Sequence, residues 1–482
     1  MEVGMLIEAR ESFAEGGRFF DRKNPMTGEV VTRAAAAKAQ DVERAVDAAA
    51  KAFPAWSKMG PTQRRGILLK AADLFDEAAP RFMEVAAQET GGTKIWLGFN
   101  VMLASRMIRE AAAMTTQISG QTIPSDKPGT YAMTVRRPVG VLVGMAPWNA
   151  PIILSVRAVA MPLACGNTVV LKASERCPRT HVMIGEIFAK AGLPEGALNV
   201  VTHSAEDAPE VVSALIAHPQ VKRINFTGST RVGKIIAEQA GRHLKPVLLE
   251  LGGKAPLLVL DDADLDAAVN AAAFGAYMNQ GQICMSTERV IVDEKVADAF
   301  VAKFAAKAAS LSFGKSSDNV VLGSVVDMDI IERVRFLVND ATSKGGKLIN
   351  GGVPDKGTIM PATIVDHVTS DMALYGDESF GPVVCVIRAR DTEHAIELAN
   401  DSEYGLSSAV FGSDITRAMD VASRIDAGIC HINGPTVGDE AQMPFGGTKD
   451  SGYGRFGGQS GIDAFTELRW LTIEDPHQHY PF

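Results

Sequence analysis

The sequence predicts an α/β protein built on parallel β-sheets. From residue 139 to residue 250, short apolar segments rich in Val, Ile and Leu alternate with helical patterns. Such alternation indicates βαβ units, because parallel neighbours need a long crossover connection. The expected strands of this first segment are 139–146, 168–172, 198–201, 223–226 and 247–249. A second α/β segment follows, with expected strands at 255–260, 290–292, 383–388, 408–411 and 430–433.

The N-terminal third is expected to be mainly helical. Short strands at 18–35 flank an Asn-Pro turn, and alanine-rich and leucine-rich patterns predict helices at 42–53, 62–89 and 96–118. Weak alternation predicts a strand at 130–137, and the C-terminal tail ends in a strand-like segment at 469–473.

Length and composition limit the function classes. A chain of 482 residues exceeds one compact core and suggests two or three domains. The net charge of −9 gives no basic patch for nucleic acid, so no nucleic-acid partner is expected. The histidines have no metal-ligand spacing, so no metal is expected either.

Location is expected to be cytoplasmic. Five scattered cysteines, an odd number, do not suggest a disulfide framework. Residues 1–20 are charged and carry no apolar core of a signal peptide. No run of about 18 apolar residues predicts a membrane-spanning helix.

Two potentially reactive side chains lie 34 residues apart. Glu250 stands in Glu-Leu-Gly-Gly-Lys, and Cys284 ends Gly-Gln-Ile-Cys. Cysteine is the strongest common protein nucleophile near neutral pH, and a buried carboxylate can act as a general base. A glutamate and a cysteine at such a spacing more often have structural roles. The adjacent glycines, however, suggest that the backbone is approached closely around a site.

Together with five further motifs in order, this pair resembles the aldehyde dehydrogenase superfamily over nearly the whole chain. The motifs are Pro147-Trp148-Asn149, Lys172-Ala173-Ser174-Glu175, Phe226-Thr227-Gly228-Ser229-Thr230, Glu378-Ser379-Phe380-Gly381-Pro382 and Pro444-Phe445-Gly446-Gly447. The resemblance implies a variant Rossmann cofactor domain, an α/β catalytic domain and a β-arm for oligomerisation.

The resemblance also assigns catalytic roles. Cys284 would attack the aldehyde carbon, and the Asn149 amide with the Cys284 N–H would form the oxyanion hole. Hydride transfer would leave a thioester, and Glu250 would activate the water that hydrolyses it. The acidic residue that usually follows Ser-Gly-x-Gly-Arg is Phe456 here, which leaves Glu250 as the base.

NAD is the expected cofactor. Glu175 follows a buried strand, where a carboxylate would accept the adenosine 2′-OH and repel a 2′-phosphate. The ordinary Gly-x-Gly-x-x-Gly fingerprint is absent, although a helix starting at Thr230 suits a pyrophosphate. By resemblance, the cofactor-binding residues are Trp148, Lys172, Ser174, Glu175, Gly228, Ser229, Gly233, Leu251, Glu378 and Phe380.

The expected substrate is an aromatic aldehyde. At helical spacing Asn149, Ile153 and Arg157 share a face. A small Ala150 near the nucleophile and a cation two turns beyond suggest a flat ring with an oxygen substituent. This resembles the aromatic-aldehyde branch, such as salicylaldehyde and vanillin dehydrogenases. The expected pocket residues are Trp96, Ala150, Ile153, Arg157, Met278, Ile283, Met285 and Phe445, with Tyr277 as a further wall.

Alternatives remain open. A structural ion pair at Arg157 is as plausible as a substrate contact. In a semialdehyde dehydrogenase, for example of succinic semialdehyde, Arg157 would clamp a carboxylate. A CoA-acylating enzyme would not need Glu250, and an inactive binding protein would not need the full catalytic set.

The expected domain boundaries follow the resemblance. The cofactor domain takes residues 1–117 and 139–250, and the catalytic domain takes 251–450. The oligomerisation arm combines 118–138 with 466–482, where an exposed strand edge is expected to be covered by another chain in a homodimer or homotetramer.

Overall fold

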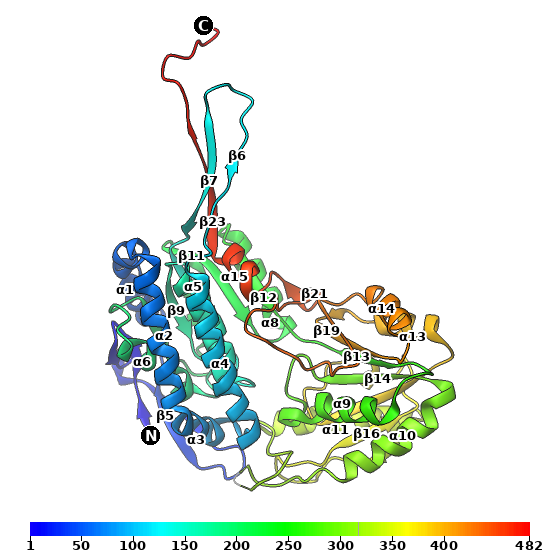
Figure 1. Cartoon of the computed structure of the whole chain (residues 1–482). Coiled ribbons are helices and arrows are strands. Elements are labelled where there is room, and N and C mark those ends of the chain that lie inside the picture. The colour runs from blue at the N-terminus through cyan, green and yellow to red at the C-terminus, as the bar shows by residue number, and fades with distance from the viewer. Residues whose placement is uncertain (317) are drawn as a thin grey trace.

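A computed structural model describes residues 1–316 and 318–482. Two lobes lie side by side, and a narrow β-arm projects from one of them (Figure 1). Each lobe is built on a mostly parallel sheet, which confirms the α/β prediction. No helix within these two ranges is long and apolar enough to cross a membrane.

The sheet of the first lobe has eight strands in the order β22-β12-β11-β8-β9-β10-β2-β3. The strands from β12 to β10 pair in parallel, and the flanking strands pair antiparallel. Their bounds are β2 Met5–Ile7, β3 Arg10–Ser12, β8 Val141–Met145, β9 Thr168–Lys172, β10 Leu198–Val201, β11 Val221–Thr227, β12 Val247–Glu250 and β22 Gly452–Tyr453. The crossover helices are α5 Pro151–Ala164, α6 Pro178–Lys190, α7 Ala208–Ala217 and α8 Thr230–Arg242.

Helices cover both faces of this sheet. One core joins it to α5 and α6 and to the N-terminal helices α2 (Pro61–Glu77) and α4 (Lys94–Met114), and a second core joins it to α1 (Ala39–Lys58), α7 and α8. The single helix expected at 62–89 is wrong, because the chain breaks at Ala78 and α3 (Ala79–Thr90) begins with Pro80 in its first turn. A small sheet of β1 Glu2–Val3, β5 Val30–Ala35 and β4 Phe19–Lys23 completes the N-terminal segment.

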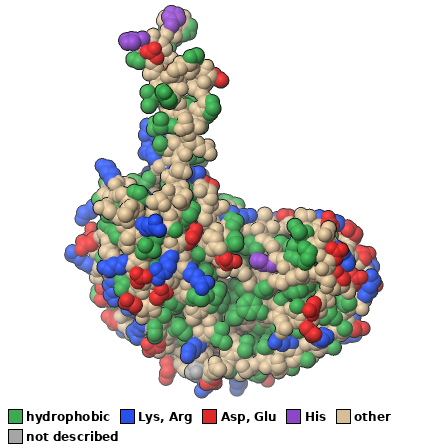
Figure 2. Space-filling view, viewed as in Figure 1, with side chains coloured by type: hydrophobic (Ala, Val, Ile, Leu, Met, Phe, Trp, Pro, Cys, Tyr) green, Lys and Arg blue, Asp and Glu red, His purple; other side chains and the backbone are tan. Residues whose placement is uncertain are grey.

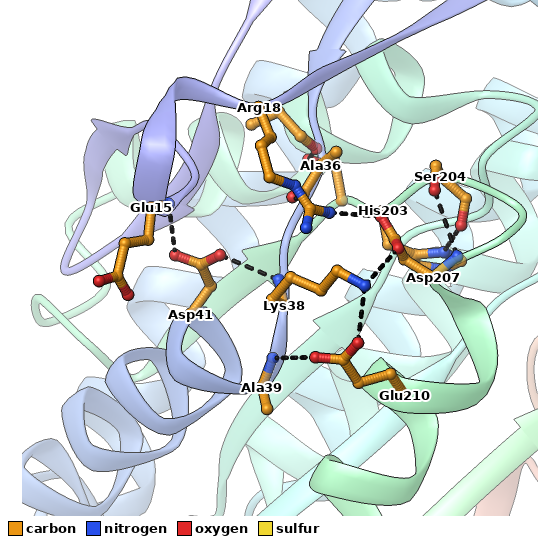
Figure 3. Close-up of polar contacts among 12 residues, drawn as sticks. Glu15, Arg18, Ala36, Lys38, Ala39, Asp41, His203, Ser204, Asp207 and Glu210 are labelled. Carbon is orange, nitrogen blue, oxygen red and sulfur yellow. Dashed lines mark hydrogen bonds and ion pairs between the residues drawn. The ribbon is translucent and has the colours of Figure 1, made fainter.

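An ionic network fixes the start of α1 against α7 (Figure 3). The Lys38 Nζ lies 2.7 Å from Asp207 Oδ1 and 2.7 Å from Glu210 Oε2. Arg18 donates to the other Asp207 oxygen at 2.6 Å. Asp41, at the third position of α1, accepts from the Lys38 N–H at 2.9 Å and so caps the first turn of the helix.

The sheet of the second lobe has seven strands in the order β15-β16-β17-β14-β13-β19-β20, with only β15 antiparallel. The bounds are β13 Ala255–Val259, β14 Thr287–Asp293, β15 Lys347–Asn350, β16 Thr363–Asp366, β17 Val383–Ala389, β19 Ser407–Phe411 and β20 Ile429–Ile432. Its helices are α9 Leu265–Tyr277, α10 Glu294–Ala309, α11 Met328–Ser343, α12 Ala373–Gly376, α13 Thr392–Asn400 and α14 Ile415–Ser423.

The β-arm consists of β6 (Thr122–Ile123), β7 (Tyr131–Pro138) and β23 (Thr466–Ile473). β23 pairs antiparallel with the full length of β7, and α15 (Gly458–Phe465) connects it to the first lobe. The remaining short elements are 3-10 helices Glu15–Gly17 and Met278–Gly281 and the strand pair β18 Tyr404–Gly405 and β21 Thr448–Lys449. The domain boundaries stay a prediction.

Candidate active site

A strained loop carries Cys284. Helix α9 ends at Tyr277, and three successive residues then adopt positive φ: Asn279 (49°), Gln280 (57°) and Gly281 (70°). A Cβ on Gly281 would lie 2.2 Å from the Gly381 carbonyl oxygen, so only glycine fits there. Such a run of left-handed residues is costly and is found where a site requires it.

Side-chain hydrogen bonds hold this loop in place. Gln280 accepts from the Gly323 N–H at 3.1 Å, and Gln282 accepts from the Val326 N–H at 2.9 Å. The Gln282 amide also donates to the Asn279 carbonyl at 3.1 Å. The loop is therefore fixed from both sides, which positions the half-buried Cys284 side chain.

Asn149 follows β8 and contacts the same loop. Its carbonyl oxygen accepts from Trp96 Nε1 and from Asn279 Nδ2, both at 2.9 Å. Its side-chain Nδ2 donates to the Gln282 carbonyl at 2.9 Å. An amide nitrogen carries two hydrogens, so one N–H of Asn149 is left over for an oxyanion.

Glu250 is a buried carboxylate at the end of β12. Its exposed fraction is 2%, and neither oxygen has a hydrogen-bond partner among residues 1–316 and 318–482. Burial raises the pKa of Glu250 well above its ordinary value, and this effect outweighs the positive charges of Arg157 and Arg455, which lower the pKa. A carboxylate of this kind holds a proton more tightly than usual and suits a general base.

Cys284, the predicted nucleophile, has a raised pKa as well. Burial raises the pKa of Cys284 to about 12, and the charges of Glu250 and Glu378 add to this effect. The Cys284 thiol is therefore protonated near neutral pH in the ligand-free protein, and substrate attack requires a proton acceptor.

A cavity of about 430 Å³ opens onto Cys284 and Asn149. All eight predicted pocket residues line it, namely Trp96, Ala150, Ile153, Arg157, Met278, Ile283, Met285 and Phe445. Its walls are mostly apolar, and Figure 2 shows hydrophobic side chains gathered in the hollow between the two lobes. A cavity of this size and character fits a small aromatic molecule.

Arg157 lines the cavity and also belongs to an ion pair. Its guanidinium binds Asp439 Oδ2, and both side chains are at most 9% exposed. The guanidinium carbon lies 4.2 Å from the ring centroid of Phe445 and 5.9 Å from that of Phe456. Burial raises the pKa of Asp439, and this effect outweighs the charge and hydrogen bond of Arg157, which lower the pKa. Arg157 therefore forms the structural ion pair and also lines the cavity, and its contact with a substrate stays a prediction.

Tyr277 does not line this cavity, so that prediction is wrong. As the last residue of α9 it points into the second lobe, where its hydroxyl donates to the Thr363 carbonyl at 3.2 Å. Its ring stacks on Phe304 with centroids 6.1 Å apart. The chain reverses immediately after Tyr277, which brings Met278 to the cavity in its place.

A second group of predicted residues lies at the end of β9. Lys172 Nζ is 3.0 Å from His203 Nε2, and Ser174 Oγ donates to Glu175 at 3.4 Å. Burial opposes the ionisation of Glu175, but Lys172 and other neighbours outweigh it and hold the pKa of Glu175 below its ordinary value. Glu175 is therefore an ionised acceptor, as a ribose hydroxyl requires.

Helix α8 starts just after β11, which β8 separates from β9 in the same sheet. Ser229 caps the helix by accepting from the Val232 N–H, and a Cβ on Gly233 would lie 2.4 Å from Leu251. The Gly228 N–H donates to the Glu250 carbonyl at 3.0 Å. The free N–H groups of the first helical turn suit a pyrophosphate.

Glu378 and Phe380 come from the loop before β17. Glu378 accepts from the Gly253 N–H at 2.9 Å, and burial raises the pKa of Glu378 to about 7. Phe380, with φ of 52°, packs edge-on against Trp148 with centroids 5.7 Å apart. Glu378 thus contacts the segment between β12 and β13, and Phe380 contacts the segment after β8.

The sequence did not predict the role of Glu288, which fixes the loop before β17. Glu288 accepts from the Ser379 and Phe380 N–H groups and pairs with the buried Lys254 Nζ at 2.6 Å. It lies in β14, four residues after Cys284, and connects the nucleophile strand to the Glu378 loop.

The residues at the sheet edge fit a dinucleotide cofactor. A cleft of about 680 Å³ lined by Glu175 and Arg176 adjoins the end of β9. In the described part of the chain, no three His, Cys, Asp or Glu side chains are grouped to hold a metal.

Comparison with known proteins decides the family. The chain matches the aldehyde dehydrogenase family over residues 13–471. It belongs to the aldehyde dehydrogenase family. It is 57% identical over 482 residues to a vanillin dehydrogenase of Pseudomonas fluorescens, with all of both chains covered. It is 52% identical over 465 residues to a salicylaldehyde dehydrogenase of Pseudomonas putida, with 96% of each chain covered.

A solved structure agrees with this assignment. The crystal structure of a salicylaldehyde dehydrogenase from Pseudomonas putida G7, complexed with salicylaldehyde, matches over 100% of both chains with a TM-score of 0.99 and 51% identity. The predicted resemblance and fold are confirmed. This aldehyde dehydrogenase is an enzyme of a family that uses NAD(P).

Several cavity residues of the aldehyde dehydrogenase were not predicted. Ile95 and Phe99 flank Trp96 on α4 and could have been found from helical spacing. Val437, Gly438, Asp439 and Glu440 come from an irregular segment without sequence periodicity, and no local pattern indicated them.

Proposed function

We propose that the enzyme oxidises an aromatic aldehyde with a ring oxygen substituent, of the vanillin or salicylaldehyde kind, to the carboxylic acid. The observation that carries this proposal is the apolar cavity that has Cys284 at its wall and a single buried ion pair, Arg157 with Asp439. Flat apolar walls suit an aryl ring, and the ion pair suits one polar substituent. The full-length relatives at 52–58% identity act on such aldehydes by name, which supports the same assignment.

Acylation of the enzyme begins at Cys284. The sulfur forms a bond to the aldehyde carbon, and its proton passes to a base. The carbonyl oxygen becomes an oxyanion, stabilised by the Asn149 amide and the Cys284 N–H, and each such donor contributes about 3 kcal/mol. A nicotinamide cofactor held by Trp148, Glu378 and Phe380 would supply the hydride acceptor for this carbon, and the product on Cys284 would be a thioester.

Deacylation uses Glu250. Its ionised carboxylate accepts a proton from water while the water oxygen bonds to the thioester carbon. The carbon–sulfur bond then breaks, the carboxylic acid leaves, and Cys284 is restored. Both Glu250 oxygens lack a hydrogen-bond partner within the described chain, which supports a role in accepting a proton from a bound water.

The proposed cofactor is NAD. The ionised Glu175 would accept the adenosine 2′-OH and repel a 2′-phosphate. Lys172, Ser174, Gly228, Ser229, Gly233 and Leu251 would hold the adenosine and pyrophosphate half, and Trp148, Glu378 and Phe380 the nicotinamide half.

We also propose a cytoplasmic homodimer or homotetramer. On the β-arm, the exposed fractions are 68% for Tyr131, 60% for Leu468, 73% for Trp470 and 61% for Ile473. Apolar side chains in such numbers on a strand edge favour pairing with a second copy.

The alternative is a semialdehyde dehydrogenase in which Arg157 clamps a carboxylate. The observation that favours it is a buried cation in the cavity. The pairing of Arg157 with Asp439 weighs against it, because a substrate carboxylate would also face the Asp439 charge.

Initial rates of NAD reduction test the proposal. The panel contains salicylaldehyde, vanillin, benzaldehyde, succinic semialdehyde and acetaldehyde. We expect the hydroxylated aryl aldehydes to have the highest kcat/KM, and Cys284→Ser to abolish activity while the half-buried Cys430→Ser control retains it. A higher kcat/KM for succinic semialdehyde than for the aryl aldehydes would contradict the proposed aromatic substrate.

A further inference from the structure

We propose that Asp439 determines substrate specificity by accepting a hydrogen bond from the ring hydroxyl of the substrate. The inference deepens the proposed function and depends on it, because it assigns the side chain that distinguishes a hydroxylated ring from other rings.

Asp439 has a free acceptor at the cavity. It lines the same cavity as Cys284, and its side chain is 9% exposed. One oxygen, Oδ2, binds Arg157, whereas Oδ1 has no hydrogen-bond partner among the residues that the structure describes. A buried acceptor without a partner destabilises the protein, and a ligand that donates a hydrogen bond to it removes this cost on binding.

The surroundings of the ion pair fix its orientation. The Arg157 guanidinium lies over the Phe445 ring at 4.2 Å and binds Asp439 on its other side. Arg157 sits on α5, two turns after the start of the helix that follows Asn149. The acceptor and the oxyanion site therefore belong to one cavity, and the contact of Arg157 with Phe445 holds the ion pair in place.

A phenolic hydroxyl matches this pair better than other substituents. It can donate to Asp439 Oδ1 while its oxygen accepts from Arg157, since a hydroxyl has both functions. A methoxy oxygen can only accept, and a hydrogen substituent does neither. A carboxylate can only accept and would be repelled by Asp439, so the same pair excludes carboxylated aldehydes.

The test replaces the acceptor by a donor of equal size. In Asp439→Asn, the amide oxygen faces Arg157, because Arg has only donors, and the amide NH₂ takes the position of Oδ1. We measure kcat/KM for 2-, 3- and 4-hydroxybenzaldehyde, for the matching methoxybenzaldehydes and for benzaldehyde. The control is Glu440→Gln, which removes the neighbouring carboxylate of the same cavity.

In the wild type, we expect at least one hydroxybenzaldehyde to exceed its methoxy partner about tenfold or more, as one hydrogen bond to a charged acceptor allows. Asp439→Asn should abolish or reverse this ratio while benzaldehyde is still oxidised, and Glu440→Gln should retain it. An unchanged ratio in Asp439→Asn would overturn the proposal.

The wild type alone gives a second test that does not depend on the variant folding. Equal kcat/KM for hydroxy and methoxy partners at all three ring positions overturns the role of Asp439, even when aryl aldehydes remain the best substrates. If benzaldehyde and all its derivatives fall below the aliphatic aldehydes, the proposed function itself fails, and the two failures are thereby distinguished.

Discussion

Glu250 shows how one residue's environment sets its chemistry. Its carboxylate is buried without hydrogen-bond partners in the described ranges, and burial raises its pKa well above the ordinary value. A group with a raised pKa loses its ability to accept a proton as pH falls through that value. The acid limb of kcat should therefore lie at higher pH than for an ordinary glutamate.

Glu250→Gln should lower kcat by about 10²–10⁴-fold, the usual contribution of a general base. Rapid mixing should still show a burst of NADH, because hydride transfer precedes the step that needs Glu250. The acid limb should also disappear from the kcat profile. Glu238→Gln, an exposed change on α8, is the control. Loss of the burst together with kcat would mean that Glu250 acts before hydride transfer.

Among the individual residues, the sequence predicted much of the candidate site but not Asp439, the partner of Arg157 in the cavity. Cys284, Glu250 and Asn149 stand in recognisable motifs, and helical spacing gave Ile153 and Arg157. Asp439 stands in an irregular segment 282 residues from its partner Arg157, and no local pattern connects two such positions. Only the folded chain brings the two charges together.

Among the elements, the loop after α9 carries the greatest strain. Three consecutive positive φ values and a glycine against the Gly381 carbonyl set the path to Cys284. The local sequence does not indicate this reversal, because Met278, Asn279 and Gln280 include no obvious helix breaker before Gly281. The left-handed turns are imposed by tertiary hydrogen bonds to Gln280 and Gln282.

Gly281→Ala should therefore damage both stability and activity. The left-handed backbone alone costs an alanine about 1–2 kcal/mol, and the clash at 2.2 Å from Gly381 O adds to it. Urea unfolding should show the loss of stability, and kcat/KM should fall as Cys284 moves. Gly66→Ala on α2 is the matched control, since its Cβ meets no atom within 4 Å and alanine there stabilises by about 0.5–1 kcal/mol. Wild-type kcat/KM in Gly281→Ala would show that the loop path does not position the nucleophile.

In the whole molecule, the two lobes and the arm are expected to have separate roles. Figure 1 shows the two lobes side by side. In the proposed function, the carboxyl edge of the first sheet holds the cofactor, and the loop before β14 in the second lobe carries Cys284. Residues of both lobes line the cavity. Strand alternation predicted both sheets. The strands β2, β3, β15, β16 and β22 were not predicted, because such short segments carry little periodicity.

The arm should control assembly. Leu468 and Trp470 are exposed neighbours on one face of β23. The double change Leu468→Glu and Trp470→Glu should shift the enzyme to a smaller species in analytical ultracentrifugation, because like charges would face each other across a paired edge. Phe336→Glu on α11, 60% exposed in the wild type, is the control and should leave the mass unchanged. An unchanged mass in the arm variant would rule out this interface.

The most direct test of the account is the mass of the Glu250→Gln enzyme after mixing with NAD and vanillin. The account predicts an added aroyl group, mapped to the peptide that contains Cys284, because the thioester forms and its hydrolysis is blocked. NADH release without an adduct, or an adduct on another cysteine, would contradict the proposed chemistry of this site.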